Sequence, residues 1–244
     1  MKNYRKPIII ICLIVAISVG IYFLLPRTSS GEGLGNSSVA IDLSQVDTSK
    51  PIEAMPMNGN IADHVKGNLK TAKVVLYEYG DYQCSGCATV NPWAKKLLEE
   101  YGEDLAIVFR SFPLTSIHPN AIAASSAVEA AALQGYWQAY GDLLFSNQAE
   151  WFYATGTKRT NYFISYFNTL AGKDGDVEKF KADMSSSEVK AKIEFDTAIA
   201  KSLNINATPA FVGSDGKEID WFEANTQEKF LNFFRNYIDS KLQD

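Results

Sequence analysis

The stretch 74-VVLYEYGDYQCSGC-87 places a run of β-branched and aromatic residues directly before two cysteines that lie three positions apart. Such a run favours a strand over 73–79. The helical spacing of residues 93–102 predicts a helix after the cysteines, and a second apolar run, 105–114, predicts another buried strand. Strand, helix and strand in this order are typical of a parallel pair joined by a crossover helix, so we expect an α/β fold.

The two thiols are the most reactive groups in this stretch. At the start of a helix, the sulfur of Cys84 lies near unpaired backbone N–H groups and the positive end of the helix dipole. Both features stabilise a thiolate and lower the pKa of Cys84, which suits disulfide exchange. Cys87 lies one turn further along and can attack a mixed disulfide formed at Cys84. The pattern therefore indicates a redox-active pair.

Three other interpretations of the cysteine pair remain open. A zinc site needs four ligands, and only His64 and His118 are available beyond the pair, at unsuitable spacing, so no metal site is expected. A purely structural disulfide would close too small a loop to add much stability. Two inert thiols are the third alternative. The position between a predicted strand and a predicted helix favours redox use over all three.

The rest of the folded part is mostly helical. Residues 119–203 carry helical patterns broken by Gly and Ser, and the Ala-rich 121–145 is one long helix or two. A hairpin is predicted next, with strands 209–213 and 218–222 around an Asp-Gly turn. The chain closes with an amphipathic helix over 226–242.

Residues 7–25 form an uncharged apolar run, about the length that a helix needs to cross a bilayer. Basic residues precede it, which predicts a cytoplasmic N-terminus and an extracytoplasmic remainder. A cleaved signal peptide is the alternative, but its apolar region is usually shorter, and 24-LLPR-27 is a poor cleavage site. We therefore expect residues 1–27 to anchor the chain in the plasma membrane, with Cys12 as an apolar residue of that helix.

Residues 28–60 are rich in Gly, Ser, Asn and Pro and show no periodicity, which predicts a flexible linker. All 28 acidic residues lie after position 27, whereas four of the 23 basic residues lie at or before it, so the remainder carries a net charge of −9. That charge gives no support for nucleic-acid binding. The apolar content of 46% suits a chain with a folded domain, which we expect over 61–244.

Four features, in this order, resemble the DsbA-like branch of the thioredoxin superfamily: 76-LYEYGDYQCSGC-87, 110-RSFPL-114, the Ala-rich helix ending in 135-GYWQAYGDLLFSNQ-148, and 207-ATPAF-211. The resemblance runs from about Asp63 to the C-terminus. It implies a thioredoxin-like fold with an inserted helical domain at about 119–200.

The resemblance also implies roles for individual residues. Cys84 is then the exposed nucleophile and Cys87 the resolving thiol. The Thr208–Pro209 bond is expected to be cis, to lie beside the cysteines and to contact the substrate. On the sequence alone, Pro209 could instead begin a strand, where its missing N–H costs nothing. No cofactor is implied.

Glu78 interrupts an apolar strand six residues before Cys84. It is either a strand carboxylate that faces solvent or a buried acid beneath the cysteines. Burial raises the pKa of a carboxyl group, so a buried Glu78 could relay the proton of Cys87. The resemblance favours the buried acid, because the family carries an acid at this position. For His118 we expect a role in shaping the start of a helix.

The spacer between the cysteines consists of Ser85 and Gly86. DsbA itself has a histidine before its second cysteine, and many members of the family have a proline after the first. Here no imidazolium is available to stabilise the Cys84 thiolate, so we expect a disulfide that is less oxidising than that of DsbA.

The sequence thus predicts a membrane-anchored thiol:disulfide oxidoreductase outside a bacterial plasma membrane, acting as an oxidase of exported proteins that carry cysteine thiols. The resemblance implies a quinone-linked, DsbB- or VKOR-like membrane partner that reoxidises Cys84 and Cys87. A disulfide reductase or isomerase is the alternative within the enzyme class. A non-enzymatic peptide-binding or chaperone module is a further alternative, against which the intact cysteines argue.

Overall fold

A computed structural model of the chain describes residues 43–44, 46–52, 55–56 and 60–243. The predicted membrane anchor 1–27, including Cys12, and the predicted linker as far as residue 42 lie outside these ranges. Within the described ranges, no helix combines the length and the apolar character that crossing a bilayer requires.

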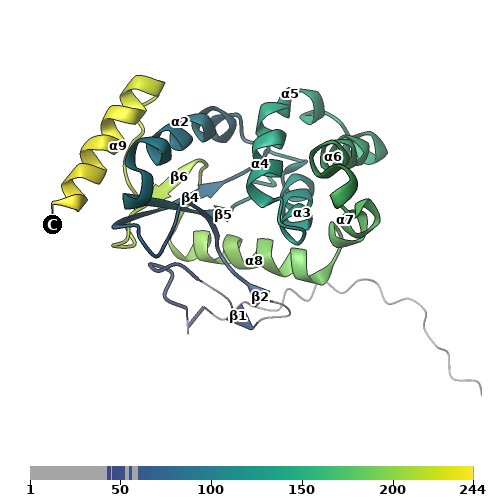
Figure 1. The fold of residues 1–244 in the computed structure, drawn as a ribbon, viewed down its shortest axis with the longest axis horizontal. Helices are drawn as coiled ribbons and strands as arrows, with labels where there is room; N and C mark the ends of the chain where they lie inside the picture. Colours follow the sequence, from purple (N-terminus) through teal and green to yellow (C-terminus); the bar gives the residue numbers. More distant parts are fainter. Residues whose placement is uncertain (1–42, 45, 53–54, 57–59, 244) are drawn as a thin grey trace, which may run out of the picture. The chain divides into compact units, whose positions relative to one another are not determined.

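A four-stranded sheet forms the centre of the fold, in the order β3-β5-β4-β6 (Figure 1). The strands are β3 His64–Lys66, β4 Val74–Gly80, β5 Leu105–Ser111 and β6 Ala210–Val212. β4 and β5 pair in parallel and are joined by α2, Ser85–Tyr101, so the predicted strand–helix–strand unit is confirmed. β3 and β6 pair antiparallel with this central pair. Burial of the central strands on both faces explains their continuous apolar runs.

Helices cover both faces of the sheet, because successive side chains of a strand point to opposite sides. Val74 and Leu76 pack against α2 and the C-terminal helix α9, Gln227–Leu242. Tyr77 and Tyr79 point the other way and pack against α8, Ser187–Ser202. In Figure 1, α2 and α9 lie above the sheet and α8 below it. The sheet is therefore packed between two layers of helices.

The segment between β5 and α8 folds into a group of helices, in the place of the expected insertion. They are α3 Ala121–Ala132, α4 Trp137–Ser146, α5 Gln148–Trp151, α6 Gly156–Ala171 and α7 Val177–Asp183, with 3₁₀ turns at Gly102–Asp104 before β5 and at Gly172–Asp174. The Ala-rich stretch forms two helices because the chain turns at Gly135, whose φ of 84° favours glycine. Aromatic side chains, among them Trp151, Phe163 and Phe167, are buried in the core of this group.

The predicted hairpin is only half right. β6 and the turn after it form, but residues 218–222 pair with β6 through a single bridge, between Val212 and Glu218. Beyond Ile219 the chain leaves the sheet, because the Asp220 carboxylate accepts the N–H of Phe222 and a local turn replaces the strand ladder. The sequence pattern also predicts neither β3 nor α5.

The predicted flexible linker 28–60 extends too far along the chain. Leu43, Val46 and Ile52 pack on the sheet face that α8 covers, and Ile52 is buried there. Further on, the short strand β1, Met55–Pro56, pairs with β2, Asn60–Ile61. Composition misleads at this point because the segment is held by hydrogen bonds from core side chains rather than by many apolar residues of its own.

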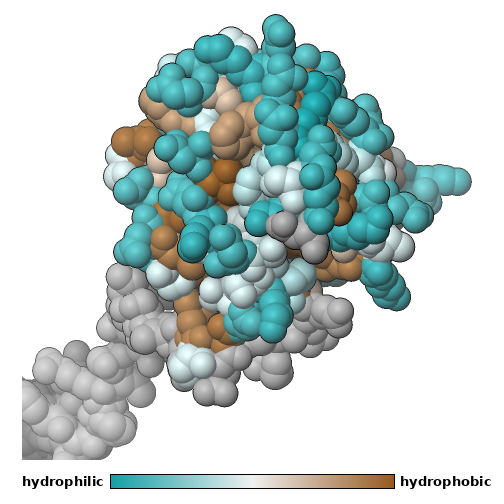
Figure 2. Space-filling view, turned by 90° about the vertical axis from the view of Figure 1, so that its left-hand side faces the viewer, coloured by the Kyte–Doolittle hydropathy of each residue, from teal (hydrophilic) through white to brown (hydrophobic). Residues whose placement is uncertain are grey.

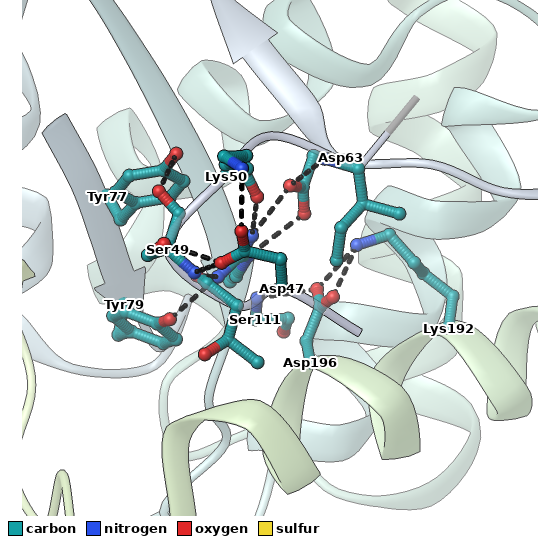
Figure 3. A network of polar contacts seen from close by, with 12 residues as sticks. Asp47, Ser49, Lys50, Asp63, Tyr77, Tyr79, Ser111, Lys192 and Asp196 are labelled. Atoms are coloured by element: carbon teal, nitrogen blue, oxygen red, sulfur yellow. Dashed lines mark hydrogen bonds and ion pairs between the residues drawn. The ribbon is translucent and has the colours of Figure 1, made fainter. Parts of the chain in front are cut away.

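Arg110 of β5 makes most of those hydrogen bonds. Its guanidinium donates to both carboxylate oxygens of Asp63, at 3.0 and 2.8 Å, and to the carbonyl oxygens of Thr48 and Lys50. It also donates to the Tyr79 hydroxyl, and Figure 3 shows Asp63, Lys50 and Tyr79 gathered in this network. Because a buried guanidinium must have its N–H groups satisfied, Arg110 ties the N-terminal segment to the sheet.

We expect Arg110→Met to lower the free energy of unfolding by about 3–5 kcal/mol, because the buried Asp63 carboxylate would lose its cation. Urea denaturation followed by tryptophan fluorescence measures the difference. Arg235→Met is the matched control, since Arg235 pairs with Glu100 at the surface, where ion pairs contribute little. If the two variants lose similar stability, the hydrogen bonds of Arg110 are not what holds the N-terminal segment on the sheet.

Candidate active site

The two cysteines lie at the N-terminus of α2, a few residues after β4 ends. Cys84 is the N-cap residue with an extended backbone, and Cys87 lies in the first turn of the helix. Cys84 is 9% exposed, whereas Cys87 is fully buried, and both are free thiols. One sulfur is therefore placed for attack by an outside group, and the other only for a reaction within the site.

The surroundings of the two sulfurs shift their pKa values in opposite directions. A hydrogen bond from the Cys87 thiol, assisted by the N–H groups of Gly86 and Cys87, lowers the pKa of Cys84 from 9.0 to about 5, although burial opposes this shift. Burial raises the pKa of Cys87 well above its ordinary value, and the adjacent Cys84 raises it further. At neutral pH the pair thus consists of a thiolate and a thiol.

The loop between α8 and β6 lies against Cys84. Its Thr208–Pro209 peptide bond is cis, as the resemblance implies, and Pro209 directly precedes β6. The Cys84 sulfur lies 3.3 Å from the Thr208 carbonyl oxygen, which accepts a hydrogen bond only from the protonated thiol. A Cβ added at Gly86 would lie 3.1 Å from Cδ of Pro209. The structure therefore brings the Cys84–Gly86 turn and the Thr208–Pro209 loop together, with Ser85 exposed beside them.

The buried carboxylate of Asp81 organises the loop that leads into Cys84. It accepts the N–H of Gln83 at 2.8 Å and the N–H of Leu114 at 2.9 Å. The Nδ1 atom of His118 lies 2.7 Å from the same carboxylate. His118, which we expected only to shape a helix start, thus also contacts the site loop. An aspartate just before a tight turn is the signal that could have indicated this role for Asp81.

Side chains from the helical group hold the same loop from outside. The Gln148 side chain donates to the carbonyl oxygens of Tyr82 and Cys84. Gln83 donates to the carbonyl oxygen of Phe152 and accepts the N–H of Asn120. Sequence reasoning missed these contacts because they join positions far apart in the chain. They fix the loop that leads to the Cys84 sulfur.

Glu78 is fully buried in β4, so the solvent-facing interpretation of this residue is wrong. Lys66 of β3 donates to its Oε2 atom at 3.1 Å, and Oε1 has no hydrogen-bond partner in the described part of the chain. Glu78 also contributes electrostatically to the raised pKa of Cys87. A role in relaying the proton of Cys87 remains a prediction.

The ammonium group of Lys66, which faces Glu78, is linked toward the surface by a series of hydrogen bonds. Lys66 donates to Oδ1 of Asn91 at 3.2 Å, and Nδ2 of Asn91 donates to Asp142 at 2.8 Å. Asp142 also pairs with Lys95. Among the described residues, no group of three or more His, Cys, Asp and Glu side chains is arranged to hold a metal ion.

We expect Gly86→His to lower the pKa of Cys84 further, because a Cβ at this position lies 3.5 Å from the Cys84 sulfur and an imidazolium would add positive charge. The disulfide should become more oxidising by several tens of millivolts, since a tenfold change in the exchange equilibrium corresponds to about 30 mV. A thiolate absorbance titration and equilibration against glutathione measure both quantities. Gly86→Ala is the control, because it crowds Pro209 without adding charge. Equal pKa values in the two variants would show that charge in the spacer does not set the redox poise.

A groove of about 750 Å³ begins beside Cys84 and runs between α2 and residues 218–225. Val90 and Trp93 line it from the helix, and Trp221 and Phe222 from the opposite segment. Pro209 lines the end nearest the sulfurs. Figure 2 views the molecule from the side of α9, where hydrophobic patches lie among hydrophilic residues. An extended apolar ligand could therefore lie against the reactive thiol.

A family model described as thioredoxin matches residues 59–235. Among curated proteins, the chain is 34% identical over 151 residues to Na⁺/H⁺ antiporter NhaA 1 of Mycolicibacterium vanbaalenii, and 33% identical over 169 residues to NhaA 1 of Mycolicibacterium gilvum. The matches cover 60% and 67% of this chain but only 22% and 25% of those proteins. The chain thus spans about a quarter of the length of these relatives.

Several solved structures have a similar fold. A thioredoxin-like oxidoreductase from Silicibacter pomeroyi has a TM-score of 0.58 and 23% identity, over 75% of this chain and 93% of that one. BdbD from Bacillus subtilis has a TM-score of 0.59 and 18% identity, over 75% and 94%. α-DsbA1 from Wolbachia pipientis has a TM-score of 0.56 and 21% identity, over 73% and 89%.

Proposed function

The chain belongs to the thioredoxin family, and on this premise we propose that it is a DsbA-like thiol:disulfide oxidoreductase that forms disulfide bonds in exported proteins. The similar folds of BdbD and α-DsbA1 support the proposal. The observation that carries the proposal is the large difference between the pKa values of the two thiols. A pKa of about 5 makes Cys84 a good leaving group, and the buried Cys87 keeps its proton at neutral pH.

The order of the reaction steps follows from this difference in pKa. A substrate thiolate attacks the Cys84 sulfur of the enzyme disulfide, and Cys87 leaves and takes up a proton. A second substrate thiolate then attacks the substrate sulfur of the mixed disulfide and releases the Cys84 thiolate. The substrate has lost two electrons and two protons and has gained a disulfide. One proton is held by Cys87 and the other passes to solvent, so the reduced enzyme carries a Cys84 thiolate and a Cys87 thiol. Glu78 is proposed to exchange the proton with Cys87.

The groove beside Cys84 supports a polypeptide substrate. Its apolar walls suit an unfolded segment, and Thr208 and Pro209 lie at the end nearest the sulfur. Binding there would hold a substrate cysteine close to Cys84, which increases the rate of a bimolecular exchange. A quinone-linked, DsbB- or VKOR-like membrane protein is proposed to oxidise the dithiol again.

The test is the direction of catalysis. The oxidised protein should restore activity to a reduced, unfolded test enzyme whose activity requires disulfides, and glutathione equilibration should give a potential more oxidising than that of the glutathione pool. A potential well below that pool, together with reduction of insulin, would support the reductase alternative instead. Failure to exchange disulfides in either direction would overturn the activity itself.

The location is also a proposal, and it rests on the uncharged run 7–25 and the basic residues before it. We expect the intact chain to stay with the membrane fraction after an alkaline carbonate wash, with residues 61–244 accessible to protease added from outside the plasma membrane. N-terminal sequencing provides the second measurement. A soluble mature form that begins near residue 28 would show that the run is a cleaved signal peptide.

A further inference from the structure

The groove beside Cys84 carries charge of one sign. Besides its apolar walls, it is lined by the carboxylates of Glu218 and Asp220, and no lysine or arginine lines it in the described part of the chain. Both acidic side chains are exposed, and within the described residues neither takes part in an ion pair. Lys217 is adjacent in sequence but does not line the groove. The groove thus presents uncompensated negative charge.

The backbone explains why these carboxylates face the groove. Ile219 is buried against the core, and its N–H donates to the carbonyl oxygen of Phe211. Side chains alternate in an extended segment, so Glu218 and Asp220 point away from that core. Phe222 follows and is 82% exposed. This aromatic ring lies beside two carboxylates that form no ion pair among the described residues. It makes no contribution to the core and is therefore available to a ligand.

We propose that the groove selects extended polypeptide segments in which lysine or arginine accompanies an apolar residue near the cysteine. The proposal rests on the proposed function, and it specifies the substrate class of the same site. An apolar side chain would lie on Trp221 and Phe222, while a lysine or arginine would pair with Glu218 or Asp220. Carboxylates at the edge of an apolar groove attract cations before contact, so the selection should act on the association rate and weaken with salt.

The probes are short blocked peptides that contain one cysteine and one leucine, flanked by lysines in one peptide and by glutamates in the other. The oxidised 244-residue chain should react faster with the lysine peptide. Lysines also lower the pKa of the peptide thiol itself, so the informative quantity is the change in the lysine-to-glutamate rate ratio between proteins. We expect Glu218→Gln combined with Asp220→Asn to reduce that ratio about fivefold at low salt and much less at high salt.

A matched control removes the same charge elsewhere. Glu103→Gln combined with Asp174→Asn changes two exposed carboxylates outside the groove lining. This control should leave the ratio near that of the parent protein. An equal fall in both double variants would show that net charge, and not the groove, selects the peptide, and would overturn the proposal. A ratio unchanged in the groove variant would overturn it as well.

A binding measurement separates this proposal from the redox function. Peptides with serine in place of cysteine cannot exchange disulfides, yet they should alter the fluorescence of the groove tryptophans Trp93 and Trp221. The parent protein should bind the lysine version more tightly than the glutamate version, and the groove variant should lose the difference. Charge-selective binding without disulfide exchange would refute the proposed function alone. Exchange without charge selectivity would refute the substrate class alone.

Discussion

Cys84→Ser is expected to reduce disulfide transfer to the uncatalysed rate, whereas Cys87→Ser should stop the reaction at a stable mixed disulfide. A serine hydroxyl cannot form the first disulfide, so no later step can follow. Without Cys87, the Cys84 thiolate still reacts with a disulfide, because its stabilisation comes partly from backbone N–H groups that the substitution retains. No second thiol is then present to release the adduct.

Mass spectrometry after incubation with glutathione disulfide measures the outcome directly. The Cys87→Ser variant should carry one glutathione at Cys84, and the Cys84→Ser variant none. Ser85→Ala is the matched control, since its side chain is exposed and a change there should leave turnover within a few-fold of the parent rate. Turnover by Cys87→Ser at the parent rate would mean that substrates supply the resolving thiol. Adduct formation at Cys87 in the Cys84→Ser variant would reverse the two roles.

The elements around Cys84 and Cys87 could be predicted because each carries a local signal. β4 and β5 are apolar runs, α2 has helical spacing, and the cysteines lie where strand and helix meet. The arrangement follows from the short connection between strand and helix, which leaves little freedom for the loop. The same reasoning correctly placed the helices after residue 119, except the four-residue α5.

The partners of Glu78 and Asp81 could not be predicted in this way. Lys66 lies on a strand of three residues, too short for a period-2 pattern to be recognised, and it meets Glu78 only because β3 and β4 both pair with β5. His118 reaches Asp81 across the end of the sheet. Contacts of this kind join residues far apart in the sequence through tertiary packing, which no local pattern specifies.

The thiolate of Cys84 should titrate near pH 5 in the reduced protein, about four units below an ordinary cysteine. The cause is the hydrogen bond from the Cys87 thiol together with the N–H groups at the start of α2, which outweigh the effect of burial. Thiolate absorbance recorded as a function of pH measures the value. The Cys84→Ser variant should lack this transition entirely, because the raised pKa of Cys87 keeps that thiol protonated over the same range.

The lowered pKa also predicts how stability depends on pH. Between about pH 5 and pH 9 the folded reduced protein binds fewer protons at Cys84 than the unfolded chain does, so its free energy of unfolding should rise with pH. The contribution is lost as the pH falls through 5, and at pH 7 it amounts to about 3 kcal/mol, at 1.36 kcal/mol per unit. Urea denaturation of the reduced protein at several pH values should show this slope, and Cys84→Ser should remove it.

The same free energy favours the reduced form of the Cys84–Cys87 pair over its disulfide. Stabilisation of the reduced form by about 3 kcal/mol makes the disulfide more oxidising by about 60 mV than a pair with ordinary thiols. With Gly86 in the spacer, that stabilisation comes from the Cys87 thiol, from Thr208 and from the N–H groups of Cys87 and Gly86, without the imidazolium that DsbA has. If Cys84 titrates near pH 9 and the slope is absent, the protein has no built-in preference for the dithiol, and the reductase alternative becomes the better account of its function.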